Sequence, residues 1–252
     1  IPLTPEGYLA VRTLRKEGMP INFTLGFSAR QNYLAARLSN PNYVNVFLGR
    51  LNQVVIENSI GEGEMVGEKV TLATQKALHD VRKQYSNVST KLIGASIRNG
   101  EQIAFLAGVD VLTIPPAAME QFSQIDHTLA LNSHLETDIQ PGIDLNHPQS
   151  ARFSKLWEVP DSFIQFVDDL LANNKLDSMS GEELELFSKD RNIDLFYPFS
   201  KGELTKIFNQ GKIPSLEDWP YKVALDDLMT WSALQSFSKD QGALDDRIRS
   251  IL

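Results

Sequence analysis

The stretch "KLIGASIRNGEQIAFLAGVDVLTIPP", residues 91–116, holds two strand-like segments with a helix-like segment between them. "KLIGAS" and "VDVLTIPP" are short apolar runs, and "GEQIAFLAG" lies between them. Parallel strands that are joined by a helical crossover are the repeating unit of an α/β fold. This stretch therefore predicts an α/β architecture.

The same rhythm runs through the residues that come before it. "PINFTLGF" at 20–27 alternates along a strand, and Ser28 is placed to cap a helix "ARQNYLAARLS". "YVNVF" at 43–47 is the next expected strand, and a helix is expected from about Glu68 to Tyr85. The sequence therefore predicts four strand–helix units in series. Strands that are joined by helical crossovers in this way run parallel to one another.

The chain opens on "IPLTPEG", an apolar strand end that runs straight into a helix. Thr4 is a good N-cap, Pro5 suits the first helical position, and Glu6 favours the positive end of the helix dipole. Gly18 is a natural residue to end this helix. With the strand end at Ile1 included, the chain supplies about half of the eight strands that a closed barrel needs.

Two parallel architectures compete, an open doubly wound sheet and a closed (β/α)8 barrel. A doubly wound nucleotide-binding sheet carries a glycine-rich first turn, and neither GxGxxG nor GxxxxGK[ST] occurs in the sequence. The barrel is therefore favoured, and its site is expected among polar residues near the C-terminal ends of the strands. Those residues are Asn22, Thr24, Asn45, Arg50, Ser96 and Arg98.

The composition limits the partners and the compartment. A net charge of −8 in 252 residues argues against nucleic acid, because binding a duplex needs a concentrated basic surface. The absence of cysteine excludes disulfides and thiolate nucleophiles and favours the cytoplasm. No apolar run approaches the roughly 20 residues of a membrane span, so no membrane association is expected.

After Phe122 the alternation of strands and helices stops. An irregular stretch is expected first, and from Ala151 onward several segments have helical character: "FIQFVDDLLANN", "GEELELFSKD", "KGELTKIFNQ" and "DWPYKVALDDLMTWSALQSFSKD". The sequence therefore divides into barrel strands and helices at 1–122 and a helical extension packed on them at 123–252.

Two arginines and a serine follow strand ends, and we expect them to converge at the mouth of the barrel. Arg50 follows the strand "YVNVF", and Ser96 and Arg98 follow "KLIGA". Two guanidinium groups and a hydroxyl that converge make a site for a phosphate monoester. The alternative is that each arginine is a surface residue in a salt bridge, and the spacing alone does not separate the two.

Taken in order, "INFTLGFS", "VNVFLGR" and "KLIGASIRNGEQIAFLAGVDVLTIPP" closely resemble the transaldolase family, including its fructose-6-phosphate aldolase branch. The resemblance covers residues 1 to about 122. It implies a TIM barrel and a transaldolase of the pentose phosphate pathway, which moves a dihydroxyacetone unit from a ketose phosphate to an aldose phosphate. The family uses a lysine Schiff base and needs no cofactor and no metal ion.

In this family the lysine ends the fourth barrel strand, in a context like K-(I/L)-P-x-T-x-E-G, and "IPLTPEG" matches the residues that follow it. The resemblance therefore implies that the lysine lies immediately before Ile1. Strands one to three and the acid/base aspartate are then expected upstream, in the same polypeptide or a companion fragment. The rival interpretation is that the chain is a truncated paralogue without these upstream parts. The sequence does not decide whether the protein forms a homo-oligomer.

The resemblance also assigns roles residue by residue. Thr24 matches a threonine that positions a catalytic water, and Asn22 matches an asparagine near the substrate. Phe47 stands where transaldolases have phenylalanine and the aldolase branch tends to have tyrosine, which favours transfer over cleavage. Asn45 replaces a serine that is common in transaldolases, and it can still bind a sugar hydroxyl. The phosphate-binding set is matched by Arg50, Ser96 and Arg98.

Other candidates for chemistry are weaker. Lys91 lies near the N-terminal end of its strand, the stability face of a barrel, so it is not the expected Schiff-base residue. The histidines show no metal-ligand spacing such as HExxH and are interpreted as structural or solvated; they are His79, His127, His134 and His147. Three rival functions remain: a fructose-6-phosphate aldolase, a non-catalytic phosphosugar-binding relative, and a barrel-derived interaction protein.

Overall fold

The structure, a computed structural model, describes residues 1–125 and 131–251. Its centre is a small parallel sheet in the order β1 (Tyr43–Phe47), β2 (Lys91–Ala95) and β3 (Val111–Leu112). Helices connect the strands, α3 (Leu48–Glu57) and α4 (Val66–Gln84) before β2 and α5 (Gly100–Phe105) before β3. The prediction of an α/β fold with parallel strands and helical crossovers is confirmed.

Two predicted strands are shorter than the sequence pattern indicated. The segment 20–27 forms only isolated parallel bridges, Pro2 with Thr24 and Asn22 with Tyr43. Leu25 has a φ of 64°, which takes the backbone out of the extended conformation and ends the pairing. The strand expected at 109–116 is reduced to β3, because the two prolines that follow it lack the N–H donors of a ladder.

The helix starts that the sequence predicted are confirmed. Thr4 caps α1 (Pro5–Lys16), and its hydroxyl accepts a hydrogen bond from the Gly7 N–H at 3.2 Å. Ser28 caps α2 (Ala29–Ser39) in the same way, by accepting from the Gln31 N–H at 3.2 Å. Both caps satisfy amide groups at the helix start that have no partner within the helix.

After α6 (Pro116–Ser123), residues 131–147 form no helix or strand, and helices follow, as expected. They are α7 (Ser154–Trp157), α8 (Asp161–Leu171), α9 (Gly181–Lys189), α10 (Lys201–Gln210) and α11 (Leu225–Ile251), with short 3-10 helices at Pro148–Arg152, Leu176–Ser178 and Leu216–Asp218. The prediction that 219–224 is helical is wrong, because α11 begins only after Pro220, at Leu225. None of the helices among the described residues is long and apolar enough to cross a membrane.

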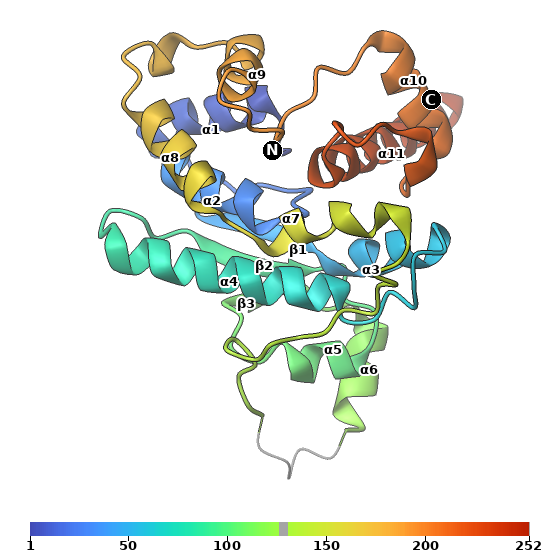
Figure 1. Ribbon diagram of the computed structural model, residues 1–252. Coiled ribbons are helices and arrows are strands. Elements are labelled where there is room, and N and C mark those ends of the chain that lie inside the picture. Colours follow the sequence, from blue (N-terminus) through green and yellow to red (C-terminus); the bar gives the residue numbers. More distant parts are fainter. Residues whose placement is uncertain (126–130, 252) are drawn as a thin grey trace.

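The later helices pack on the earlier ones in one hydrophobic core. In Figure 1, α4 lies along the sheet, α5 and α6 lie at one end of the molecule, and α8 to α11 lie at the opposite end. The ring of Tyr8 in α1 lies 5.7 Å from that of Phe196, and the ring of Tyr33 in α2 lies 6.4 Å from that of Phe163 in α8. Burial of these aromatic rings is what joins the two regions.

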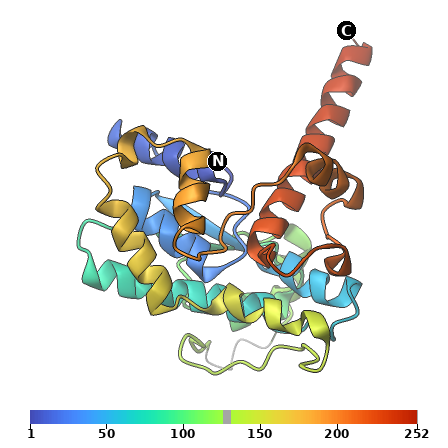
Figure 2. The same cartoon turned by 45° about the horizontal axis from the view of Figure 1, so that its top comes forward.

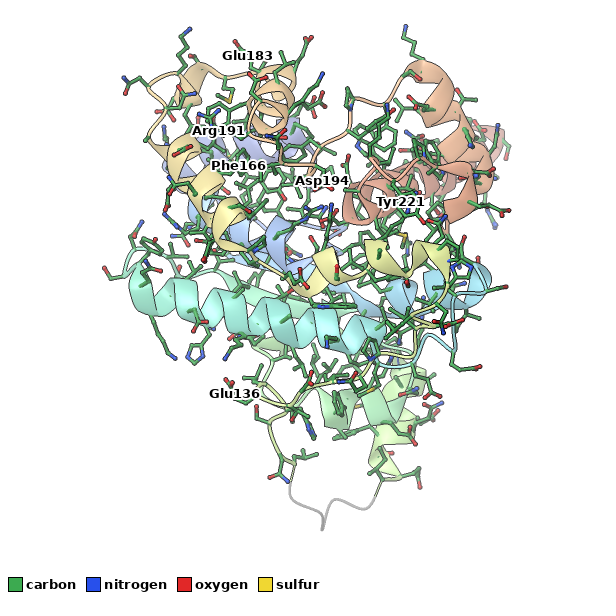
Figure 3. The ribbon with its side chains drawn as sticks, in the orientation of Figure 1. Glu136, Phe166, Glu183, Arg191, Asp194 and Tyr221 are labelled. Carbon is green, nitrogen blue, oxygen red and sulfur yellow. The ribbon has the colours of Figure 1, made fainter. Side chains whose placement is uncertain are left out.

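A buried ion pair connects α2 with α11. The Asp226 carboxylate, which is inaccessible to solvent, accepts from Arg30 Nε at 2.8 Å, from Arg30 Nη2 at 2.9 Å and from Ser28 Oγ at 2.7 Å. Arg30 Nη1 also donates to Asp194 at 2.6 Å, and Asp194 lies beside the start of α11 in Figure 3. Burial opposes the charged form, but the Asp226 carboxylate raises the pKa of Arg30 above its usual range.

Replacing Asp226 with Ala leaves the Arg30 guanidinium buried with only one carboxylate. We expect the free energy of unfolding to fall by about 3–5 kcal/mol, as is typical when one partner of a buried pair is removed. The measurement is urea unfolding of Asp226→Ala beside the parent protein. Asp177→Ala is the control, because its pairs with Arg12 and Lys16 are exposed, and it should change stability little. Equal stability of the two variants would contradict the role given to Asp226.

Candidate active site

All seven residues that the sequence singled out line one cavity of about 460 Å³. It lies at the C-terminal ends of the strands and is completed by four residues that the sequence did not single out. The predicted lining is Asn22, Thr24, Asn45, Phe47, Arg50, Ser96 and Arg98, and the added lining is Ile93, Ala95, Thr113 and Lys212.

The strand register explains why these side chains share a face. Asn45 pairs with Ile93, and Phe47 pairs with Ala95. Neighbouring residues along a strand point to opposite faces, and a Cβ on Gly94 would lie 3.6 Å from the Thr71 side chain of α4. The residues on either side of Gly94 therefore face away from α4, into the cavity.

Arg50 is buried in the cavity wall with part of its guanidinium unused. Its guanidinium lies against two rings, 5.5 Å from the centroid of Phe47 and 5.2 Å from that of Phe237. Only 9% of Arg50 is exposed, and Nη1 is buried without a hydrogen-bond partner. Burial lowers the pKa of Arg50, the nearby Arg98 lowers it further, and Asp240 acts in the opposite direction. A buried N–H of a charged group without an acceptor is costly, so this geometry favours an anionic ligand.

Ser96 and Arg98 belong to a tight turn that packs against the start of α3. Ser96 has a φ of 66°, a conformation that costs energy for a residue other than glycine. The Arg98 N–H donates to Gln102 Oε1 at 2.7 Å, which fixes the turn on α5. Gly49 permits the close approach, because a Cβ there would lie 2.3 Å from the Ser96 carbonyl oxygen and 2.7 Å from Arg98 Nε. No carboxylate is part of the cavity lining within residues 1–125 and 131–251.

Asn45 is tied to the backbone of the neighbouring segment. Its Nδ2 donates to the Phe23 carbonyl at 2.9 Å, and its Oδ1 accepts from the Gly26 N–H at 3.1 Å. Asn45 therefore holds segment 22–26 against β1 from within the cavity wall. The side chains of Asn22 and Thr24, by contrast, form no hydrogen bonds with the part of the chain that the structure describes, and both are open to a ligand.

The weaker candidates lie away from this cavity. Lys91 is exposed at the first position of β2, the end opposite the cavity. The His134 ring stacks on Phe105 at 4.3 Å, and His147 Nδ1 accepts from the Gln149 N–H. His79 is exposed, and His127 lies outside the described residues. Over residues 1–125 and 131–251, no group of three His, Asp or Glu side chains is arranged to hold a metal ion.

Two residues of the site come from the helical extension. Lys212 follows α10 and lines the cavity, and Phe237 of α11 covers the Arg50 guanidinium. Nothing in the local sequence around either residue marks it as functional, because their place in the site depends on how the extension packs. Only the tertiary structure identifies them.

The sequence pattern of the family described as "Transaldolase/Fructose-6-phosphate aldolase" matches residues 1–170. The chain belongs to this family. The match continues past residue 122, where the recognisable motifs end, and takes in α7 and nearly all of α8. The start of the helical region is therefore part of the family pattern.

Curated relatives agree with this membership. A "Probable transaldolase" of Caldicellulosiruptor saccharolyticus is 36% identical over 160 residues, which cover 63% of this chain and 59% of that protein. A "Probable transaldolase" of Aquifex aeolicus is 36% identical over 166 residues, 64% of this chain and 60% of its own. A "Transaldolase" of Chlamydia caviae is 28% identical over 199 residues, 77% of this chain and 54% of its own. The chain thus spans about half to three fifths of the length of these relatives.

The packing of Gly49 on the Ser96–Arg98 turn gives a test of how the site is built. In Gly49→Ala the new methyl group must push the turn away, and we expect about 1–3 kcal/mol of lost stability and weaker binding of inorganic phosphate. Both are measured on one sample, by denaturant unfolding and by calorimetric titration. Gly202→Ala is the control, because a Cβ at Gly202 in α10 meets nothing within 4 Å. If Gly49→Ala matches Gly202→Ala in both measurements, the close contact has no role in the site.

Proposed function

We propose that this chain forms the phosphate-binding part of a transaldolase of the pentose phosphate pathway. The substrate is a ketose phosphate such as fructose 6-phosphate or sedoheptulose 7-phosphate, and a dihydroxyacetone unit passes to an aldose phosphate. The observation that carries the proposal is the buried, unpartnered Nη1 of Arg50 in a cavity that also holds Ser96 and Arg98. An anion with several acceptor oxygens satisfies those donors. Membership of the family indicates which anion this is.

We further propose that the strands belong to the second half of a (β/α)8 barrel, the fold implied by the family. Parallel pairing supports this beyond the three-stranded sheet. The Phe23 N–H donates to the Tyr43 carbonyl at 2.9 Å, and the Thr24 N–H donates to the Ile1 carbonyl at 2.8 Å. Segments 1–2 and 22–24 therefore continue the strand order on the β1 side, in the arrangement that a barrel requires.

The proposal places the Schiff-base lysine in the residue that precedes Ile1. Ile1 is bracketed by Asn22 and Thr24, because its nitrogen donates to the Asn22 carbonyl at 3.2 Å and its carbonyl accepts from the Thr24 N–H. In this parallel register the preceding residue pairs with Asn22. Asn22 lines the cavity, so the preceding side chain also points into it. This is the position that the family motif gives to the lysine.

In the proposed reaction the arginines hold the phosphate while the chemistry proceeds at the other end of the sugar. The neutral lysine amine attacks the C2 ketone, and the ketone oxygen leaves as water; Thr24 positions the catalytic water. The resulting iminium withdraws electrons as the C3–C4 bond breaks, and a carboxylate removes the C4 hydroxyl proton. The C4–C6 part of fructose 6-phosphate then leaves as glyceraldehyde 3-phosphate, and the three-carbon unit stays bound to the lysine until a second aldose phosphate accepts it. Phe47, which stands where transaldolases have phenylalanine, lines the cavity and supports transfer over simple cleavage.

A coupled assay separates the proposed transfer from simple cleavage. With the protein produced from its whole gene, glyceraldehyde 3-phosphate should form from fructose 6-phosphate only when erythrose 4-phosphate is present. Release without the acceptor would identify an aldolase, and no release under either condition would contradict an enzymatic function. Borohydride reduction during turnover followed by peptide mass mapping should find a three-carbon adduct on the lysine before Ile1. An adduct on Lys212 would contradict the proposed position of that lysine.

Arg98→Ala tests the phosphate assignment. Losing a charge-assisted hydrogen bond to phosphate costs about 1.5–3 kcal/mol, so KM for fructose 6-phosphate should rise roughly 10- to 100-fold. Steady-state kinetics gives KM and kcat separately. Arg249→Ala serves as the matched control, because Arg249 is exposed near the end of α11 and, among the described residues, forms its ion pair with Asp246. An unchanged KM in Arg98→Ala would refute the assignment.

A further inference from the structure

We propose that Lys212 is a third cationic ligand of the phosphate, supplied by the helical extension, and that it makes the cavity selective for a doubly ionised phosphate monoester. This inference rests on the proposed function, because it assumes that Arg50 and Arg98 bind the same group. It assigns a specificity role to a lysine that lies outside the residues matched by the family pattern, which end at 170.

The Lys212 side chain lines the cavity and has a free ammonium group. Within residues 1–125 and 131–251, its Nζ forms no hydrogen bond and no ion pair, and the side chain is exposed to solvent. Neighbouring lysines of the extension are engaged elsewhere. Lys206 Nζ donates to the Asp218 carbonyl at 2.7 Å, and Lys155 Nζ pairs with Asp194. Lys212 is therefore available to an anion in the cavity.

The backbone around Lys212 is held against the same helix that begins at the cavity. Asn58, which ends α3, donates from Nδ2 to the Pro214 carbonyl at 3.0 Å and accepts at Oδ1 from the Leu216 N–H at 2.7 Å. Ile213 and Leu216 are buried on either side of this contact. Lys212 thus lines the cavity from a fixed backbone, so that binding an anion has to order only its side chain and no further backbone.

The charges in the cavity match the ligand. A phosphate monoester presents three terminal oxygens and carries up to two negative charges at neutral pH. The buried Arg50 and the exposed Arg98 supply planar forks, and Lys212 supplies a point charge with three donors. The described lining residues include no carboxylate, and Asp240, whose charge acts on Arg50, does not line the cavity, so the net field within the cavity is positive. A dianion gains more from this field than a monoanion or a neutral sugar.

The test is a calorimetric titration with inorganic phosphate on the protein produced from its whole gene. We expect Lys212→Met to weaken binding 3- to 10-fold at low salt and by a smaller factor at 0.15 M salt, since Lys212 is exposed and screened. Lys212→Arg should restore affinity to within about twofold, and Lys212→Glu should weaken binding beyond the Met variant. Lys201→Met, an exposed lysine of α10 away from the cavity, should bind phosphate like the parent.

Kinetics adds a readout that a purely structural role would not change. In Lys212→Met the loss should fall on KM for fructose 6-phosphate and not on kcat. If Lys212→Met binds phosphate like the parent while Arg98→Ala is weakened, the role of Lys212 is refuted and the proposed function stands. If neither the parent protein nor any variant binds phosphate at millimolar concentration, the phosphate site itself is refuted, and the role of Lys212 with it.

Discussion

The buried carboxylate of Asp226 is the interaction on which the arrangement of the rest of the site depends. It accepts from Ser28, which also caps α2 and follows the segment that carries Asn22 and Thr24. It accepts as well from Arg30, two residues further along. The first turn of α11 is thereby fixed against the end of a cavity-lining segment. Buried ion pairs often contribute more to a unique arrangement than to stability, and here the arrangement is that of α11 over Arg50.

Much of the fold was predictable because its signals are local. The caps at Thr4 and Ser28 and the alternation in β1 depend on neighbours only a few residues away. The segment 20–27 was predicted to be a full strand, and the positive φ of Leu25 interrupts it. That angle is accompanied by a hydrogen bond from the Thr230 hydroxyl to the Leu25 carbonyl, across more than 200 residues. No local pattern contains such a contact.

The residues of the candidate site also differ in how far the sequence predicts them. Residues at strand ends were found from the sequence, because parallel strands bring their C-terminal ends together whatever the remaining packing. Lys212 and Phe237 were not found, because they reach the cavity through the docking of the extension. Asn45 was predicted to bind a sugar hydroxyl, which stays a prediction, and the structure adds that its amide holds segment 22–26 in place. The sequence therefore predicted which strand-end residues line the cavity, but not which of them fix the position of neighbouring segments.

The course of α11 has a consequence for the protein during its synthesis. The helix starts at Leu225 against the body and then runs outward, as Figure 2 shows. On the way it places Phe237 over the Arg50 guanidinium. Translation proceeds from the N-terminus, so the strand ends and both arginines leave the ribosome well before Phe237 does. Until then the Arg50 guanidinium lacks the cover of the Phe237 ring and is open to water on that side. The nascent chain therefore makes its strand ends first, and Arg50 becomes buried only when the last helix has packed.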